Sequence, residues 1–240
     1  MNAADRFFQR WLSPILFGIW SASLLYLIAS QRYTAFLRPG FRLLLVLAHF
    51  IAMGFMIAAM PGERPSRLDF SGVLRAVVLL VPILFLMTMP EATLGSRAFK
   101  NRFVGTAGIT AALPGPPAPP PRGIYRSDRE LTVFNLFLNP ERFEGQRVTF
   151  TGMMLHDEQL GKYFGGRDTA VFRFLINCCA ADALPLAVAV DSDRARKMAN
   201  DQWVRVEGIF HLCQIEGDAV PVVEDAAVQP VDAPKFPYLY

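Results

Sequence analysis

Two long runs of apolar residues near the N-terminus constrain this chain more than any other feature. Trp11 to Ala29 contains no charged residue, and Leu43 to Met60 contains only His49 as an ionisable group. An α-helix rises about 1.5 Å per residue, so each run is long enough to cross a hydrocarbon core of about 30 Å. The first run exceeds the usual apolar length of a signal peptide. The runs therefore predict two retained membrane spans, at about residues 11–29 and 43–60.

A third apolar stretch, Ala76 to Pro90, is shorter and carries Pro82 near its middle. A buried helix, a re-entrant segment and a short span in a locally thinned bilayer are the alternatives for such a stretch. Basic residues flank it on both sides, where long side chains can reach lipid headgroups: Arg75, Arg97, Lys100 and Arg102. We interpret residues 74–90 as a third span, so that residues 1–90 form a transmembrane region.

Composition changes after these segments. Basic residues outnumber acidic ones in residues 1–90, and the balance reverses in residues 123–240, although the whole chain carries +3. An acidic soluble part gives no reason to expect a nucleic-acid partner, because such binding draws most of its affinity from neutralised phosphates. Residues 91–123 join the halves as a basic flank and a proline-rich linker. The run from Leu113 to Pro121 predicts an extended spacer, with a docking site for a proline-recognition module as the alternative.

Residues 124–240 are expected to form a soluble all-β domain with its own core. Leu131 to Leu138 predicts a short helix or a strand-helix entry, which Pro140 ends, and Asp191 to Asn200 predicts a second short helix. Gly152 is a candidate β-bulge. Apolar patterning predicts five strands, at Arg147–Met153, Ala170–Ile176, Pro185–Val190, Trp203–Phe210 and Ala219–Val223. Their order favours an OB-like Greek-key barrel, with a five-stranded sandwich as the alternative.

Several short motifs carry a resemblance to a known family over nearly the whole chain. They are Tyr33 with Leu37–Phe41, Pro90 with Leu94–Ser96 and Asn101–Arg102, Asn139–Pro140 with Gly145, Arg173–Phe174, Cys178–Ala183, Trp203–Gly208 and Pro237–Tyr240. With these motifs the chain resembles uncharacterised proteins described as subunits of a two-component membrane permease complex. The double-cysteine block is the most specific of the motifs.

The resemblance implies a membrane subunit whose barrel-like domain works beside a separate multi-span permease of the predicted organoarsenical-permease type. The genes of that family often lie near zinc-homeostasis genes. The resemblance therefore implies a transition metal as cargo, and zinc or another thiophilic metal is the cofactor that it suggests. We expect a multi-pass protein of the cell (inner) membrane. Lys and Arg are spread too evenly to fix its topology, and we favour a soluble domain on the extracytoplasmic side.

Cys178 and Cys179 are the residues with the most distinctive chemistry. The sequence that follows them is typical of a turn, and in a turn both sulfur atoms can converge on one ion, with Asp182 adding a carboxylate oxygen. His211 and Cys213 are two residues apart at the end of a predicted strand and therefore face the same side. Thiolate and imidazole are good zinc ligands. We therefore predict a metal site from Cys178, Cys179, Asp182, His211 and Cys213.

Two alternatives stand beside this metal site. Cysteines often pack as small apolar residues, and no zinc-ribbon CxxC pair is present. In an oxidising compartment, Cys178 or Cys179 can instead form a disulfide with Cys213. His49, inside a predicted span, is a separate case: it either turns toward a partner helix or a polar pathway, or is a neutral side chain bonded to a backbone carbonyl. No catalytic triad, paired-carboxylate pocket or nucleotide fingerprint is present, so we expect no enzyme activity.

Overall fold

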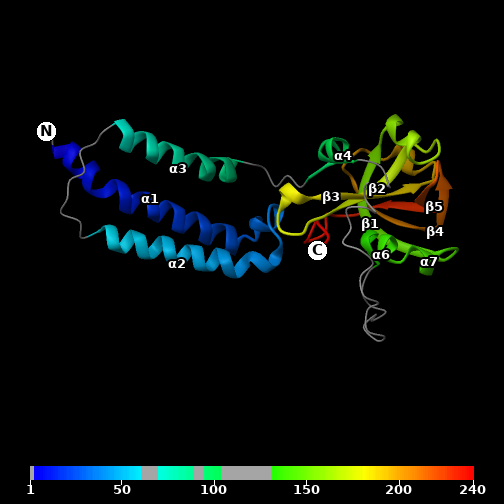
Figure 1. Cartoon of the computed structure of the whole chain (residues 1–240), viewed down its shortest axis with the longest axis horizontal. Helices are drawn as coiled ribbons and strands as arrows, with labels where there is room; N and C mark the ends of the chain where they lie inside the picture. The colour runs from blue at the N-terminus through cyan, green and yellow to red at the C-terminus, as the bar shows by residue number, and fades with distance from the viewer. Residues whose placement is uncertain (1–2, 61–69, 89–93, 104–130) are drawn as a thin grey trace. The chain divides into compact units, whose positions relative to one another are not determined.

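The computed structural model describes residues 3–60, 70–88, 94–103 and 131–240. The chain divides into two compact units, Met1–Ala92 and Thr93–Tyr240. They run from blue to cyan and from green to red in Figure 1. The predicted proline-rich spacer lies outside the described residues, so that prediction stays open.

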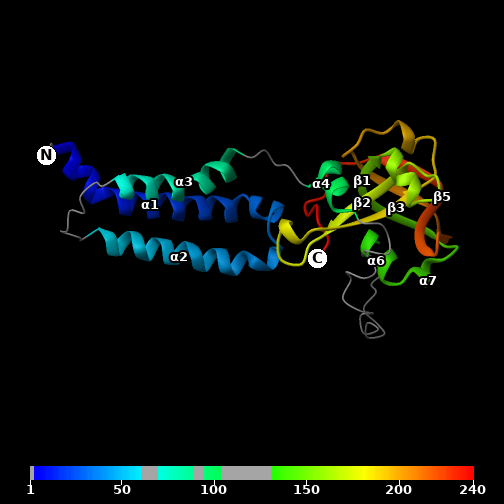
Figure 2. The ribbon, with the colours of Figure 1, turned by 45° about the horizontal axis from the view of Figure 1, so that its top comes forward.

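The first unit consists of helices. Its elements are α1 (Ala3–Ala29), the 3₁₀ turns η1 (Arg32–Ala35) and η2 (Pro39–Phe41), α2 (Arg42–Ala59) and α3 (Phe70–Thr88). Helices α1 and α2 lie side by side in every view (Figures 1 and 2), and the rings of Phe17 and Phe55 stack between them with centroids 5.4 Å apart. Pro14 and Pro82 lie inside α1 and α3.

Two segments of the described chain are long and apolar enough to cross a membrane, Trp11–Ala29 and Pro39–Ala59. Their apolar side chains are largely exposed, as in Leu43 at 78 %. In water such a surface is unfavourable, whereas lipid solvates it. The first two predicted spans are therefore confirmed as helices of spanning length. The apolar part of α3, Leu74–Leu86, is shorter, and the third span stays a prediction.

His49 connects α2 to α1. Its Nδ1 lies 3.0 Å from the carbonyl oxygen of Ser21 and 3.0 Å from the Ser21 hydroxyl. The carbonyl can only accept a hydrogen bond, whereas the Ser21 hydroxyl can either donate to Nδ1 or accept from it. His49 therefore lies toward the partner helix α1 and beside a backbone carbonyl, so its contacts fit both expected roles.

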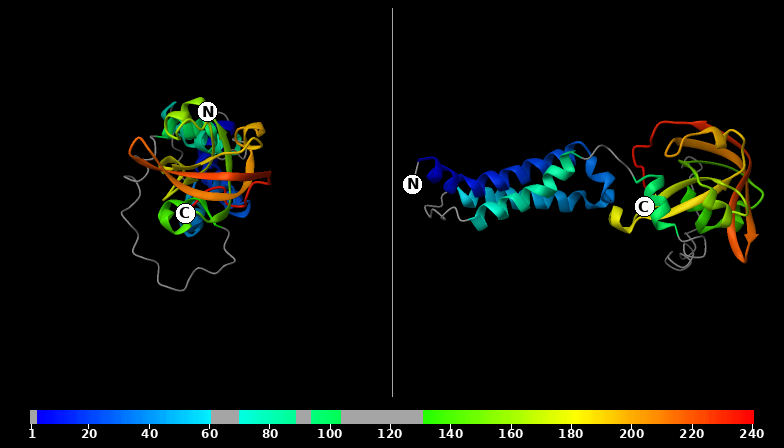
Figure 3. Two further views of the ribbon diagram at one scale, coloured as in Figure 1. Left: turned by 90° about the vertical axis from the view of Figure 1, so that its right-hand side faces the viewer. Right: turned by 90° about the horizontal axis from the view of Figure 1, so that it is seen from above.

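The second unit is a closed barrel of five strands in the order β1-β2-β3-β5-β4. The strands are β1 (Arg147–His156), β2 (Thr169–Leu175), β3 (Leu184–Val190), β4 (Trp203–Ile215) and β5 (Asp218–Pro230). Neighbours are antiparallel except β3 and β5, which are parallel, and β4 pairs with β1 to close the barrel. Figure 3 shows the curvature of these strands. Because the sheet closes into a barrel, the alternative of a five-stranded sandwich is wrong.

Strands β2 and β3 are buried on both faces. Along β2, Val171 belongs to one apolar cluster, whereas Phe172 and Phe174 point to the opposite face and belong to a second. Helix α6 (Val133–Leu138) packs on the first cluster through Val133 and Leu136. This two-sided burial explains why β3 is apolar throughout and why β2 is apolar apart from Thr169 and Arg173, with little alternation in either strand.

The structure contains the predicted strands and the first short helix, but several elements begin or end at other residues than predicted. The predicted strands ending at Phe210 and Val223 continue to Ile215 and Pro230. The predicted helix at Asp191–Asn200 is only the 3₁₀ turn η5 (Ala195–Lys197). Helix α6 begins at a Thr132 capping box, and α7 (Pro140–Phe143) follows at the predicted proline. The 3₁₀ turn η3 (Glu158–Lys162) lies between β1 and β2.

The predicted bulge at Gly152 is wrong, because Gly152 pairs in register with Val204. The irregularity lies between Glu207 and Ile209, at Gly208. A Cβ atom on Gly152 would lie 2.6 Å from Cγ1 of Val171, and one on Gly208 would lie 2.5 Å from Cγ1 of Val223. Both glycines therefore allow close approach of a neighbouring strand.

The basic flank after α3 has a role that its sequence did not suggest. Residues Ser96–Arg102 form α4, which belongs to the barrel unit. Phe99 of α4 is 1 % exposed and lies in the second apolar cluster, and Lys100 pairs with Asp157 at 2.7 Å. Lys100 and Arg102 bind the barrel, so the expectation that they extend to lipid headgroups does not hold.

Candidate metal centre

The two adjacent cysteines lie in the loop between β2 and β3. Ile176, just before them, donates its N–H to the carbonyl of Leu239 at 3.0 Å, and Leu239 donates to Phe174 at 2.8 Å. The C-terminal segment therefore extends the sheet beside the end of β2. After the cysteines, the 3₁₀ turn η4 (Ala180–Asp182) returns the chain to β3. The cysteines are thus held between a strand end and a tight turn.

The carboxylate of Asp182 organises this loop. Its Oδ1 accepts the N–H of Asn177 at 3.1 Å, and its Oδ2 accepts the N–H groups of Cys178 at 2.8 Å and of Cys179 at 3.5 Å. In return, the N–H of Asp182 donates to the carbonyl of Cys179 at 3.1 Å. These contacts fold the chain back on itself, which is why the two cysteine side chains do not alternate as they would in a strand.

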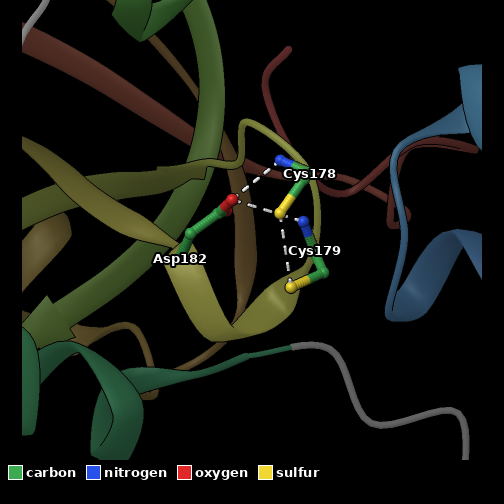
Figure 4. A group of neighbouring side chains, drawn as sticks. All are labelled: Cys178, Cys179 and Asp182. Carbon is green, nitrogen blue, oxygen red and sulfur yellow. Dashed lines mark hydrogen bonds between the residues drawn. The ribbon is translucent and has the colours of Figure 1, made fainter.

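The sulfur atoms converge, as the turn predicted. The Sγ atoms of Cys178 and Cys179 are 3.6 Å apart, and with an Asp182 carboxylate oxygen they form a group whose members all lie within 4.8 Å. Figure 4 shows the sulfur of Cys178 between the carboxylate and the other sulfur. Cys178 is exposed and Cys179 is half-buried. Among the described residues, Cys178, Cys179 and Asp182 form the group whose ligand atoms lie close enough together to hold one metal ion.

Hydrogen bonding sets the protonation of the group. The hydrogen bonds to Asp182 and then to Cys179 raise the pKa of the Cys178 thiol to about 11. Burial raises the pKa of Asp182, but the hydrogen bonds from the Cys178 thiol and the backbone amides outweigh it and lower that pKa overall. At neutral pH the Cys178 thiol is therefore protonated, and a metal ion that binds its sulfur must displace the proton.

Arg102 of α4 supports the turn from outside. Its Nη1 donates to the carbonyl of Ala180 at 2.8 Å and to that of Ala183 at 3.4 Å. Sequence reasoning did not find this residue, because it lies 78 positions before Ala180 in the chain. The only signal was its membership of the Asn101–Arg102 motif that carries the family resemblance.

Arg173 supports the C-terminal segment beside the loop. This arginine on β2 is only 8 % exposed, and its guanidinium lies 5.6 Å from the ring centroid of Trp203. It donates to three successive backbone carbonyls: those of Phe236 at 2.7 Å, Pro237 at 3.2 Å and Tyr238 at 3.4 Å. The hydroxyl of Tyr238 in turn accepts the N–H of Leu94 at 3.0 Å. Residues from both ends of this unit are thus tied together next to the cysteines.

The other two predicted ligands lie elsewhere. His211 on β4 contacts Glu144, with its Nδ1 3.0 Å from Oε1, and Oε2 of Glu144 accepts the N–H of Leu212 at 2.8 Å. The hydrogen bond from His211 holds the pKa of Glu144 below its ordinary value. Cys213 pairs opposite Val220 and packs at the edge of the second apolar cluster. All three cysteines are free thiols. The structure therefore brings together Cys178, Cys179 and Asp182 without His211 or Cys213.

Fold and site define a class of protein: a five-stranded closed barrel with a vicinal-thiol loop, in a chain whose described residues also include two apolar helices of membrane-spanning length. Residues 131–240 match the family model described as the DUF1980 C-terminal domain. The match includes all five strands and the cysteine loop, but not α4 or the apolar helices. No curated protein and no solved structure matches the chain.

Proposed function

We propose that this chain is a membrane-anchored accessory subunit of a permease complex, and that its cysteine loop binds a thiophilic metal ion such as zinc. One observation carries the proposal: two thiols and a carboxylate oxygen lie within 4.8 Å of one another at a solvent-accessible turn. Sulfur and carboxylate oxygen are both established ligands of zinc.

The spacing of the two sulfur atoms suits one metal ion. With zinc–sulfur bonds of about 2.3 Å, a sulfur separation of 3.6 Å corresponds to an angle of about 103° at the metal. That angle is near the tetrahedral value of about 109° that zinc prefers. Linear coordination by the same two sulfurs would require them to move apart by roughly 1 Å.

The donor set is suited to handover rather than to permanent storage. Cys178, Cys179 and Asp182 supply at most three ligands, whereas structural zinc sites are usually closed by four protein ligands. A position left for water or for a donor from another protein allows the ion to be exchanged. An accessory subunit that passes cargo to a permease needs such an open site.

The membrane part of the proposal rests on the helices. We infer that α3 adds a third span to the two helices of spanning length, and that the barrel is OB-like and lies on the extracytoplasmic side of the cell membrane. The strand order β1-β2-β3-β5-β4, with the parallel β3 and β5 pair, supports the OB-like class. The partner would be a multi-span permease of the organoarsenical-permease type, as the family resemblance implies.

One observation favours a different function. Both carboxylate oxygens of Asp182 already accept hydrogen bonds inside the loop, so the carboxylate is satisfied without a metal. On this view the barrel is a non-enzymatic structural or regulatory interaction module that binds no small ligand.

Zinc titration of the purified full-length chain separates the two functions. The reduced protein in detergent is titrated against a competing chelator, beside the double variant Cys178→Ser/Cys179→Ser and the control Cys213→Ser. A metal site predicts one zinc ion per chain in the wild type and in Cys213→Ser, and none in the double variant. Equal zinc uptake by all three proteins, or no uptake by any, would leave the interaction module as the function.

A further inference from the structure

We propose that Cys178 and Cys179 are also a reversible oxidation site, at which exchange with a small-molecule disulfide joins their two sulfur atoms in a vicinal disulfide. The effect on metal binding rests on the proposed function, but the oxidation chemistry does not depend on it. The proposal is carried by the proximity of two solvent-accessible thiols that belong to adjacent residues.

The starting geometry is favourable. The Sγ atoms are 3.6 Å apart, and formation of a bond of about 2.05 Å requires them to approach by roughly 1.5 Å. Both side chains already lie on one side of the turn (Figure 4), so rotation about their side-chain bonds supplies most of this movement. Cys213, which packs at the edge of the second apolar cluster, is not part of this pair.

The reaction proceeds by two exchange steps. The thiolate of Cys179 attacks a small disulfide, so that a Cys179–S–S–R bond forms and one RS⁻ leaves. The sulfur of Cys178 then attacks the Cys179 sulfur and releases the second RS⁻. The proton of Cys178 passes to solvent by way of the Asp182 carboxylate, with which the thiol is hydrogen-bonded. Two thiols are oxidised and one R–S–S–R is reduced to two RSH, so atoms and electrons balance.

The product is expected to be easily reduced. Adjacent Cα atoms across a trans peptide are about 3.8 Å apart, whereas disulfides usually join Cα atoms separated by about 4.4 to 6.8 Å. A disulfide between neighbouring residues is therefore strained, and strained disulfides are the more reducible ones. This property distinguishes a regulatory bond from a structural one.

Oxidation would remove both sulfur ligands in one step. A disulfide sulfur carries no negative charge and is a poor ligand for zinc compared with a thiolate. Asp182 alone, with its oxygens accepting hydrogen bonds from the loop, does not replace the two sulfurs. The redox state of the surroundings would thus decide whether the loop accepts a metal ion.

Mass spectrometry of the full-length chain tests the oxidation directly. The reduced protein in detergent is incubated with oxidised glutathione and digested without reduction. We expect the peptide carrying both cysteines to lose two hydrogen atoms, and a mild dithiol to restore them. In Cys178→Ser and in Cys179→Ser we expect a stable glutathione adduct instead, while Cys213→Ser behaves as the wild type.

Two results would overturn the oxidation site: a lasting glutathione adduct on the wild-type loop, or a disulfide that links it to Cys213. Zinc uptake is measured on the same samples, before and after oxidation. A vicinal disulfide without zinc uptake in either state would contradict the proposed metal binding and leave the oxidation site intact. Zinc uptake that is equal in both states would refute the coupling between them.

Discussion

Arg102 donates a hydrogen bond of 2.8 Å to the carbonyl of Ala180, in the turn that ends with Asp182. The guanidinium also bonds the carbonyl of Ala183, so a single side chain of α4 holds both ends of the turn. The geometry of the cysteine loop therefore depends on a helix that lies far away in the sequence. Any displacement of α4 from the barrel would release one side of the candidate metal centre.

Replacement of Arg102 by alanine is expected to weaken zinc binding about thirtyfold, because two hydrogen bonds worth about 1 kcal/mol each are lost and the turn becomes free to open. Arg97→Ala is the matched control, since Arg97 is an exposed residue of the same helix. Competitive zinc titration measures both variants. Equal loss of affinity in the two would show that the charge of α4 matters and that its contact with the turn does not.

Asp182→Asn is expected to lower the pKa of Cys178 from about 11 toward its ordinary value of 9.0, because the amide lacks the negative charge that holds the proton. Iodoacetamide should therefore modify Cys178 faster in the variant than in the wild type between pH 9 and 11. In the wild type, the folded-state pKa is the raised one, so this hydrogen bond stabilises the fold below pH 9.0 and its contribution is lost as pH rises toward about 11. Unchanged alkylation rates would contradict this role of Asp182.

The ion pair between Lys100 and Asp157 is expected to make the docking of α4 sensitive to acid. The hydrogen bond from Lys100 holds the pKa of Asp157 below its ordinary value of 3.8. The pair therefore stabilises docking above that pH, and its contribution is lost as pH falls through the lower folded-state pKa. The Lys100 side chain is about half exposed and that of Asp157 is 13 % exposed, so solvent screens the pair in part and the loss is about 0.5 to 1 kcal/mol. Hydrogen exchange of α4 should show this acid dependence in the wild type and a smaller one in Lys100→Met.

His211→Ala is expected to leave zinc affinity within about twofold of the wild type, because His211 contacts Glu144 and not the cysteine loop. The unfolding free energy should fall by about 1 kcal/mol or less, the usual value of a solvent-exposed contact between two polar side chains. Zinc titration and denaturant unfolding give the two quantities. A tenfold loss of affinity would place His211 among the ligands after all, as its spacing from Cys213 predicted.

Local pattern predicted much of the fold. The uncharged runs placed both ends of α2 to within one residue and located the C-terminal end of α1, although α1 begins at Ala3, eight residues before the predicted start. Strand propensity located all five strands, since both signals depend on neighbours along the chain. The extension of β5 past Glu224 and Asp225 was missed because its polar residues pair with β4 at long range. The docking of Phe99 was missed for the same reason: nothing near it in the sequence distinguishes a barrel contact from a membrane flank.

The candidate site was predicted in part. The turn after Cys179 correctly indicated convergence of the sulfurs, because adjacent side chains meet only where the backbone reverses. The period of two along β4 correctly placed His211 and Cys213 on one strand, but a strand pattern carries no information about which distant loop it faces. Glu144, which contacts His211, precedes it by 67 positions. The sequence indicated Asp182 only as a metal ligand. It did not indicate that the carboxylate accepts hydrogen bonds from three backbone N–H groups.

The pairing of Leu239 with the end of β2 has a practical consequence for mapping the compartment of the thiols. A reporter protein joined after Tyr240 would emerge beside Ile176, only two positions before Cys178 along the strand and loop. Whichever side of the bilayer that reporter faces, the cysteine pair faces it too. One C-terminal fusion whose activity requires an oxidising compartment would therefore report the chemical surroundings in which Cys178 and Cys179 operate.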